Sequence, residues 1–270
     1  GLRGFELLEQ LEPEGFSVRA ARKALGLLGA ERAPAGKFPV MFDPAVTGLF
    51  VHEAIGHNAE ADGVWAGESI LEGKVGQQIA AEGVSIFDDA TVEGAYGSYA
   101  YDSEGVRGQK KCLVEKGVLQ GFMHSLETAK KFGVTPNGSA RAEGHQSKPI
   151  VRMSNTYISP GDWRLDEIIK DTKEGILLKG GYWGYVFVER GQFTCNAEEA
   201  WMVRNGEVKE HLRNVSVSGL TLEALKEIDA VSKDFELKLP GMCGKGGQAM
   251  YIDAGGPYLR VRQLVVGGQR

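Results

Sequence analysis

Residues 43–58 read DPAVTGLFVHEAIGHN, and the local structure of this stretch determines how the rest of the chain is interpreted. Asp43 is a typical helix-capping residue, and Pro44 suits the first helical position because it lacks the N–H group that would stay unpaired there. The residues that follow are mostly apolar. We therefore predict a helix from Pro44 to about His57, directly after a short strand at residues 39–42.

This predicted helix carries two histidines and a glutamate within six residues. Neutral imidazoles bind zinc, and a neighbouring glutamate accepts a proton from the water at the metal, so the combination is typical of hydrolytic zinc sites. His52 and His57 are therefore candidate metal ligands, and Glu53 is the candidate base. The alternative is two histidines that pack on a helix beside a surface glutamate.

The spacing of the histidines differs from the zincin pattern, in which they lie four residues apart. Five residues separate His52 from His57, which leaves their side chains roughly 140° apart on a regular α-helix, too far for one ion. A π-bulge would realign them, and such bulges are common at functional sites. Gly56 is also a suitable place for the helix to end. The motif therefore predicts an irregular helix.

A hydrolytic zinc site needs a third protein ligand. The candidates are His124, His145, His211 and the three cysteines. Cys243 stands out because flanking glycines let a backbone approach a metal and Lys245 favours the thiolate. Its segment, PGMCGKGGQ at residues 240–248, superficially resembles a phosphate loop, but Gly246 stands where that loop needs Ser or Thr. An inert thiol is the alternative for Cys243, and the three histidines are structural or surface residues by default.

The remaining segments are mainly β-prone and are separated by glycine-rich turns, in keeping with the 38 glycines of the chain. The predicted strands are 84–88, 111–115, 118–123, 150–158, 176–179, 182–189, 200–204, 207–218, 249–253 and 258–266, with turns at 116–117, 180–181 and 205–206. The predicted helices are 17–30, 125–133, 165–172 and 222–231, and 31–38 is a linker. Strands do not alternate regularly with helices, so we predict an α+β fold, a β-rich, mostly antiparallel sheet domain with a metal-binding helix.

Composition excludes several classes of protein. Hydrophobic residues make up 42% and charged residues 25% of the chain, as in soluble globular proteins. The net charge of −5 and the absence of a long basic cluster disfavour nucleic-acid binding. No apolar run reaches the roughly 20 residues that a membrane helix needs. Three widely spaced cysteines are a poor disulfide framework, so we predict a cytoplasmic protein.

Several segments together resemble the TldD/PmbA metalloproteases, and within that family the TldD-like, catalytic members. The resemblance extends from about residue 20 to the end of the chain. It rests on the segments Phe42–Pro44, Gly48–Asp62, Asp88–Asp89, Gly97–Tyr99, His124–Ala129, Arg152–Tyr157, Pro240–Lys245 and Leu264–Gly268, in this order. It implies one zinc ion held by His52, His57 and Cys243, with Glu53 as the general base.

The resemblance also implies the organisation and the substrates of the protein. Family members form two-fold dimers, often of a catalytic subunit and a non-catalytic paralogue, and cleave unfolded peptides or small proteins. We accordingly expect a homodimer or such a heterodimer, with no nucleic-acid or membrane partner. Residues 1–38 would be a helix and linker that remain from a larger N-terminal domain, and residues 39–270 would be the catalytic domain.

Other polar residues are weaker candidates for the site. Arg152 and Asn155 are possible substrate contacts, although an arginine and an asparagine that satisfy turns are at least as common. Tyr96, Tyr99 and Tyr101 are candidates for lining the cleft, against the commoner alternative of a tyrosine-rich sheet surface.

A non-enzymatic, metal-stabilised subunit that binds peptides or partners is the alternative function. Glu53 distinguishes the two possibilities, because a purely structural zinc site needs no base beside its ligand. The sequence therefore favours a zinc-dependent metallopeptidase.

Overall fold

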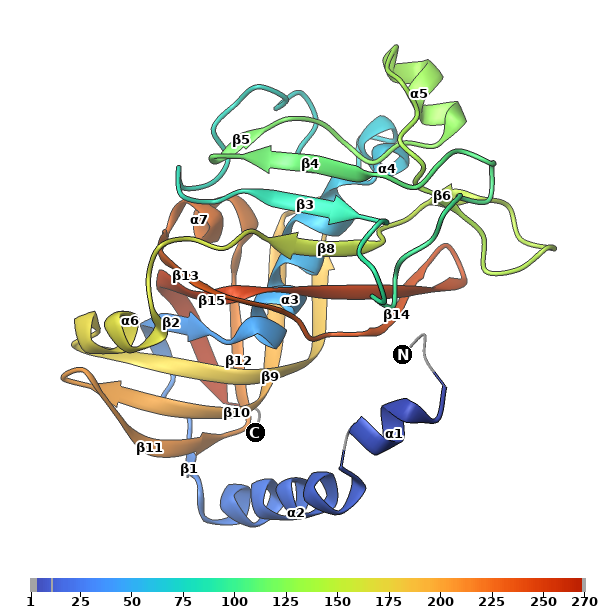
Figure 1. The fold of residues 1–270 in the computed structure, drawn as a ribbon. Helices are drawn as coiled ribbons and strands as arrows, with labels where there is room; N and C mark the ends of the chain where they lie inside the picture. The colour runs from blue at the N-terminus through green and yellow to red at the C-terminus, as the bar shows by residue number, and fades with distance from the viewer. Residues whose placement is uncertain (1–3, 11, 269–270) are drawn as a thin grey trace.

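The structure is a computed structural model that describes residues 4–10 and 12–268 (Figure 1). Its helices are α1 (Glu6–Gln10), α2 (Pro13–Gly29), α3 (Pro44–Val51), α4 (Ala61–Trp65), α5 (Leu126–Phe132), α6 (Leu165–Asp171) and α7 (Thr221–Lys226), with a π-helical turn at His52–Gly56 and a 3-10 turn at His57–Ala59. Its strands are β1 (Glu31–Arg32), β2 (Gly36–Phe42), β3 (Ile86–Asp89), β4 (Lys110–Glu115), β5 (Val118–Leu119), β6 (Ala140–Arg141), β7 (Ile150–Val151), β8 (Asn155–Ile158), β9 (Glu174–Phe187), β10 (Gln192–Arg204), β11 (Glu207–Arg213), β12 (Val215–Leu220), β13 (Ile228–Leu237), β14 (Gly241–Lys245) and β15 (Gln248–Gly268).

A 13-stranded sheet organises these elements, and β6 and β7 form a separate pair. The main path runs β1-β11-β10-β9-β2-β15-β8-β3-β4-β5, while β12, β13 and β14 also pair with the long β15. Most neighbouring strands are antiparallel, and the parallel pairs are β1–β11, β2–β9 and β8–β15. The predicted β-rich, mostly antiparallel α+β fold is confirmed.

Helix α3 begins where the sequence predicts. One carboxylate oxygen of Asp43 accepts a hydrogen bond from the backbone N–H of Val46 at 2.8 Å, which caps the first turn. The other oxygen accepts from the backbone N–H of Gly180 at 3.0 Å and so connects the start of the helix to β9. Every residue of α3 is buried, so this element is a core helix that carries the histidines inward.

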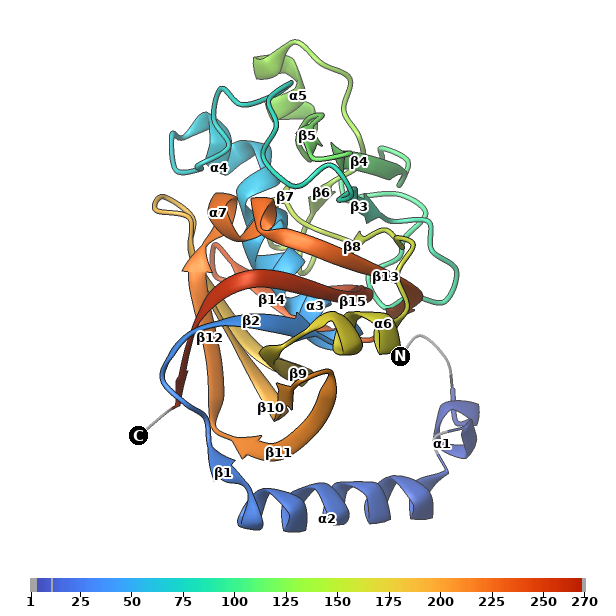
Figure 2. The same ribbon diagram turned by 90° about the vertical axis from the view of Figure 1, so that its left-hand side faces the viewer.

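The backbone of α3 lies directly against β15, as the two views in Figures 1 and 2 show. A Cβ atom at Gly48 would lie 2.6 Å from the nitrogen of Gly255 and 2.7 Å from the carbonyl carbon of Ala254, so only glycine permits this approach. On another side, the ring of Phe50 packs edge-on against Phe193, with 5.0 Å between centroids. Packing on these sides fixes the position of the helix in the core.

The structure corrects several predicted boundaries. The predicted turn at 180–181 lies inside β9: Gly180 has a positive φ of 71°, the register with β10 shifts just after it, between Gly181 and Trp183, and the strand continues. The predicted helix at 222–231 ends at Lys226, and its last residues belong to β13, which pairs with β15. The predicted linker at 31–38 contains β1 and the start of β2.

Helix α2 begins at Pro13, earlier than the predicted residue 17, and follows an N-terminal segment that includes α1. It contacts β11 near its C-terminal end, where Gly26 faces His211, and most of its residues are exposed (Figure 1). Among the described residues, no helix is both long enough and apolar enough to cross a membrane.

We predict that Gly48→Ala destabilises the protein, because the new methyl group would overlap the backbone of β15. Overpacking of this kind lowers the free energy of unfolding by about 1–3 kcal/mol or more. Gly63→Ala in α4 is the matched control, since no atom lies within 4 Å of its Cβ position. The control should be neutral or more stable by up to about 1 kcal/mol in chemical denaturation. Equal stability of the two variants would contradict the packing described here.

Candidate metal centre

The π-helical turn at His52–Gly56 brings the two histidines together. The backbone N–H of His57 donates to the carbonyl oxygen of His52, which spaces this turn by five residues rather than four. The two imidazole rings consequently lie 4.9 Å apart between centroids. The irregular helix that the spacing predicts is therefore present, and its irregularity is a π turn.

Cys243 reaches the same place from β14, far away in the sequence. Its sulfur lies 3.3 Å from Nε2 of His57, and one ligand atom from each of His52, His57 and Cys243 lies within 4.8 Å of the others. In a tetrahedral zinc site with Zn–S about 2.3 Å and Zn–N about 2.0 Å, ligand atoms are roughly 3.5 Å apart. The donor set and its dimensions thus fit a zinc-like ion.

Glu53 lies beside this cluster and is only 8% exposed. Burial raises its pKa above the ordinary value for a glutamate, although the nearby histidines partly oppose the shift. Strand β9 passes closely because Gly184 has no side chain: a Cβ there would lie 3.0 Å from Cγ of Glu53. A carboxylate of raised pKa in a partly closed site is suited to accept and return a proton.

Glu60 contacts His57 through the ring nitrogen that does not face Cys243. Its Oε2 lies 3.1 Å from Nδ1 of His57, so the imidazole donates there and presents Nε2 to Cys243. Burial opposes both charges, yet the mutual attraction lowers the pKa of Glu60 and raises the pKa of His57 well above the ordinary value. Lys245, whose ammonium group lies 3.2 Å from Glu60, lowers the pKa of Glu60 further. The carboxylate therefore fixes the orientation of the His57 ring.

The thiol of Cys243 is activated by its neighbours. Burial by itself would raise its pKa, but hydrogen bonds and charge from His52 and His57 outweigh burial and lower the pKa to about 5. Lys245, expected from the sequence to favour the thiolate, instead pairs with Asp62 at 2.6 Å and with Glu60. Near neutral pH the metal-free site thus holds a thiolate beside a protonated imidazole, and metal binding must displace that proton.

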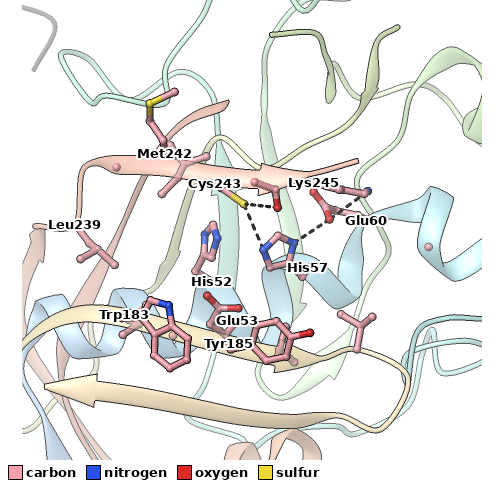
Figure 3. A pocket seen from close by; sticks show the side chains of 18 of the residues that line it. His52, Glu53, His57, Glu60, Trp183, Tyr185, Leu239, Met242, Cys243 and Lys245 are labelled. Carbon is pink, nitrogen blue, oxygen red and sulfur yellow. Dashed lines mark hydrogen bonds and ion pairs between the residues drawn. The ribbon is translucent and has the colours of Figure 1, made fainter. Parts of the chain in front are cut away.

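The cluster opens into a cleft of about 680 Å³. All of β14 lines one side of the cleft, and residues of β9 line the other. Figure 3 shows Trp183 and Tyr185 of β9 beneath the histidines, with Cys243 above them on β14. These aromatic side chains are half-exposed, at 53% and 49%. The centre is therefore reached from solvent through this cleft.

The possible role of Arg152 and Asn155 as substrate contacts is wrong. Arg152 and Asn155 have no exposed surface. Asn155 donates to the carbonyl oxygen of Asp89 and accepts from the backbone N–H of Gly97 at 2.9 Å, so it connects a loop to the sheet. Both residues act inside the protein and do not line the cleft.

The tyrosines and remaining histidines also lie away from the centre. Tyr96, Tyr99 and Tyr101 are not among the residues that line the cleft; the hydroxyl of Tyr99 donates to a backbone carbonyl, at Gly138. The other histidines considered as ligands are His124, which is buried, His211, which stacks on Trp201, and His145, which is exposed.

From the sequence, no role was assigned to Glu60, to Gly184, or to Trp183 and Tyr185, which form the aromatic wall on β9. Glu60 carried a usable signal, because a carboxylate three residues after a candidate ligand on a helix lies on the same face. No sequence signal marked Gly184 or Trp183, because their position near Glu53 depends on how β9 crosses α3.

The fold and the cluster define an α+β domain with a candidate site of two histidines and one cysteine that opens into a cleft. The model of the PmbA/TldA metallopeptidase C-terminal domain matches residues 35–268. The chain therefore belongs to the PmbA/TldA metallopeptidase family.

Its relatives carry names of the same kind. A protein named metalloprotease from Methanothermobacter thermautotrophicus is 49% identical over 99% of this chain and 58% of its own length. A protein named zinc metalloprotease TldD homolog from Saccharolobus solfataricus is 36% identical over 92% of this chain and 55% of its own length. The chain thus spans little more than half the length of these relatives.

Solved structures have the same fold. A Thermotoga maritima protein has a TM-score of 0.79 and 29% identity, over 96% of this chain and 56% of that one. TldE from Thermococcus kodakarensis has a TM-score of 0.75 at 22% identity, over 94% and 55% of the two chains, a likeness of fold alone.

We predict that Cys243 of the chelator-treated protein reacts first with iodoacetamide at pH 6.5. This pH lies above the pKa of about 5 of Cys243, whereas burial raises the pKa of Cys112 and of Cys195 above the ordinary thiol value. Only Cys243 is then a thiolate, which is the reactive form. Peptide mass spectrometry at successive times measures the order in which the three cysteines are labelled. Denatured protein is the control, in which the labelling rates of the three cysteines should converge. Faster labelling of the more exposed Cys112 would contradict the assigned charge state.

Proposed function

We propose that this chain is the catalytic part of a zinc-dependent peptidase that hydrolyses unfolded peptides or small proteins. The observation that carries the proposal is the convergence of His52, His57 and Cys243 within 4.8 Å at an open cleft, beside a buried Glu53. Two imidazoles and one thiolate would bind one ion and leave a fourth position for water or substrate. The names of the relatives support a peptidase.

The residues of the chain divide the chemistry among them. A bound zinc ion supplies a Lewis acid that polarises the scissile carbonyl and lowers the pKa of water. Glu53 accepts the proton of the attacking water and delivers it to the leaving amine, a transfer that suits its raised pKa. Glu60 keeps Nε2 of His57 turned toward Cys243 throughout. Trp183 and Tyr185 of β9 line the cleft opposite Cys243.

An extended peptide fits this cleft. In the described part of the chain, β14 pairs with β15 and with no other strand, and all its residues line the cleft. Its second edge can therefore bind a peptide backbone by strand addition, which gives affinity with little dependence on sequence. Unfolded segments meet this requirement, whereas folded proteins do not present a free backbone.

The assembly and the compartment are proposals of the same kind. We infer a two-fold dimer, either of identical chains or with a non-catalytic paralogue, and the shared fold with TldE supports the second form. The cytoplasm stays a prediction that rests on three free cysteines.

We predict that Glu53→Gln retains zinc but lowers the rate of peptide hydrolysis about 10²- to 10⁴-fold, because the amide cannot accept the proton. The measurement is cleavage of an unstructured fluorogenic peptide together with metal content, with Glu115→Gln, an exposed glutamate outside the cleft, as the control. Cleavage by Glu53→Gln at the normal rate would make the mechanism wrong. Zinc-loaded wild type that binds peptides without cleaving them would instead support the non-enzymatic, peptide-binding alternative.

We also predict that the wild type holds about one zinc ion per chain after dialysis and that Cys243→Ala loses most of it, because a three-ligand site has been reduced to two. Elemental analysis by mass spectrometry measures the stoichiometry. Cys112→Ala is the matched control, since this cysteine lies on β4, outside the cleft. Equal zinc content in both variants would overturn the assignment of Cys243 as a ligand.

A further inference from the structure

Arg152 is the largest fully buried side chain among the described residues, and its guanidinium is directed at the candidate centre. Nη2 donates to the carbonyl oxygen of Cys243 at 2.5 Å, and Nη1 donates to the carbonyl oxygen of Gln248 at 3.2 Å. Cys243 belongs to β14 and Gln248 begins β15, so one guanidinium holds both strands of the hairpin that carries the thiol.

The same guanidinium faces the carboxylate behind the second histidine. Nε of Arg152 lies 3.9 Å from Oε1 of Glu60, and neither atom has a hydrogen-bond partner among the described residues. The other oxygen of Glu60 contacts Nδ1 of His57 at 3.1 Å. A continuous path of polar contacts therefore runs from the backbone of Cys243 through Arg152 and Glu60 to the ring of His57. Figure 3 shows Glu60 between His57 and β14.

Lys245 forms a second connection between the same two segments. It lies two residues after Cys243 on β14, and its ammonium group is 3.2 Å from Glu60 and 2.6 Å from Asp62. Lys245 is partly exposed, at 25%, whereas Arg152 and Glu60 are buried, at 0% and 2%. Solvent screens the buried pair less, whereas Lys245 lies closer to Glu60 and lowers its pKa more than Arg152 does.

We propose that Arg152 and Glu60 are positioning residues that hold His57 and the Cys243 hairpin at metal-binding distance before a metal arrives, a role that rests on the proposed zinc site. The two ligands are 186 residues apart in sequence, and nothing in local structure brings a hairpin to a helix. Without internal contacts, the metal would have to order the hairpin as it binds, and that entropy cost would weaken affinity.

The chemistry of arginine suits this task. Its planar fork can serve two carbonyl oxygens and face a carboxylate at once, whereas the ammonium of lysine is a single point charge. Complete burial excludes contact with a peptide in the cleft. Arg152 therefore acts on the reaction only through the ligands that it positions.

The test compares zinc affinity among purified variants of the chain, by competition of zinc with a chromogenic chelator. Arg152→Gln and Glu60→Gln should each weaken zinc binding about 10- to 100-fold, the usual effect of losing a partner of a metal ligand. If the two residues act as a unit, the zinc affinity of the double variant should be only slightly lower than that of whichever single variant binds zinc more weakly. Cobalt(II) in place of zinc should show a changed thiolate–cobalt absorption band in Arg152→Gln.

Arg141→Gln is the matched control. Arg141 is also buried, at 8% exposure, and donates to two backbone carbonyls, those of Met153 and Tyr251, each at 2.7 Å. It therefore fastens the same hairpin through β15 but contacts neither Glu60 nor the backbone of Cys243. Its removal should lower the metal-free stability about as much as Arg152→Gln, while zinc affinity stays within about threefold of wild type.

Two results would overturn the inference. One is an Arg152→Gln variant with wild-type zinc affinity; the other is equal loss of affinity in Arg141→Gln and Arg152→Gln, which would show a general structural effect. Peptide cleavage is measured on the same samples. Wild type that binds zinc without cleaving peptides would refute the proposed catalysis but leave the affinity comparison valid, whereas wild type that binds no zinc would refute both.

Discussion

A single backbone hydrogen bond, from the N–H of His57 to the carbonyl of His52, sets the geometry on which the candidate centre depends. A regular α-helix would leave the two imidazoles roughly 140° apart, whereas the five-residue turn brings the ring centroids to 4.9 Å. Such a turn is rare, so the surrounding packing has to select it. Gly56 contributes here, because Met153 fills the space where its Cβ would lie, with sulfur 2.0 Å from that position.

The rest of the site is built around this helix by close backbone approaches and by paired charges. Gly48 lets α3 lie against β15, and Gly184 lets β9 pass beside Glu53. Glu60 and Arg152 enter the core as charged groups, which is costly unless each finds a partner. They face each other and contact the two segments that carry His57 and Cys243. Burial thus makes one arrangement of helix and hairpin much more favourable than others.

Local sequence patterns predicted the structural features that depend only on residues close together in the chain. The Asp43 cap, the β4–β5 hairpin at Lys116–Gly117 and the helix predicted at 125–133, which is α5, are all present. The errors came where long-range pairing outweighed local preference. Strand β9 continues through Gly180 because β10 pairs with it on both sides of the bulge. The helix predicted at 222–231 gives way to β13 because β15 offers a partner there.

By itself the sequence determined the two histidines, the need for an irregular helix between them, the glutamate beside them and the β-rich class, because these follow from residue type, spacing and periodicity over a few residues. The glycine-rich setting of Cys243 made it a candidate third ligand, and the family resemblance selected it. Only the tertiary structure decided that Arg152 is buried behind the site, that Glu60 orients His57, and that Trp183 and Tyr185 form the opposite wall of the cleft. These contacts join segments distant along the chain, and their energies depend on burial and close packing, which no local pattern records.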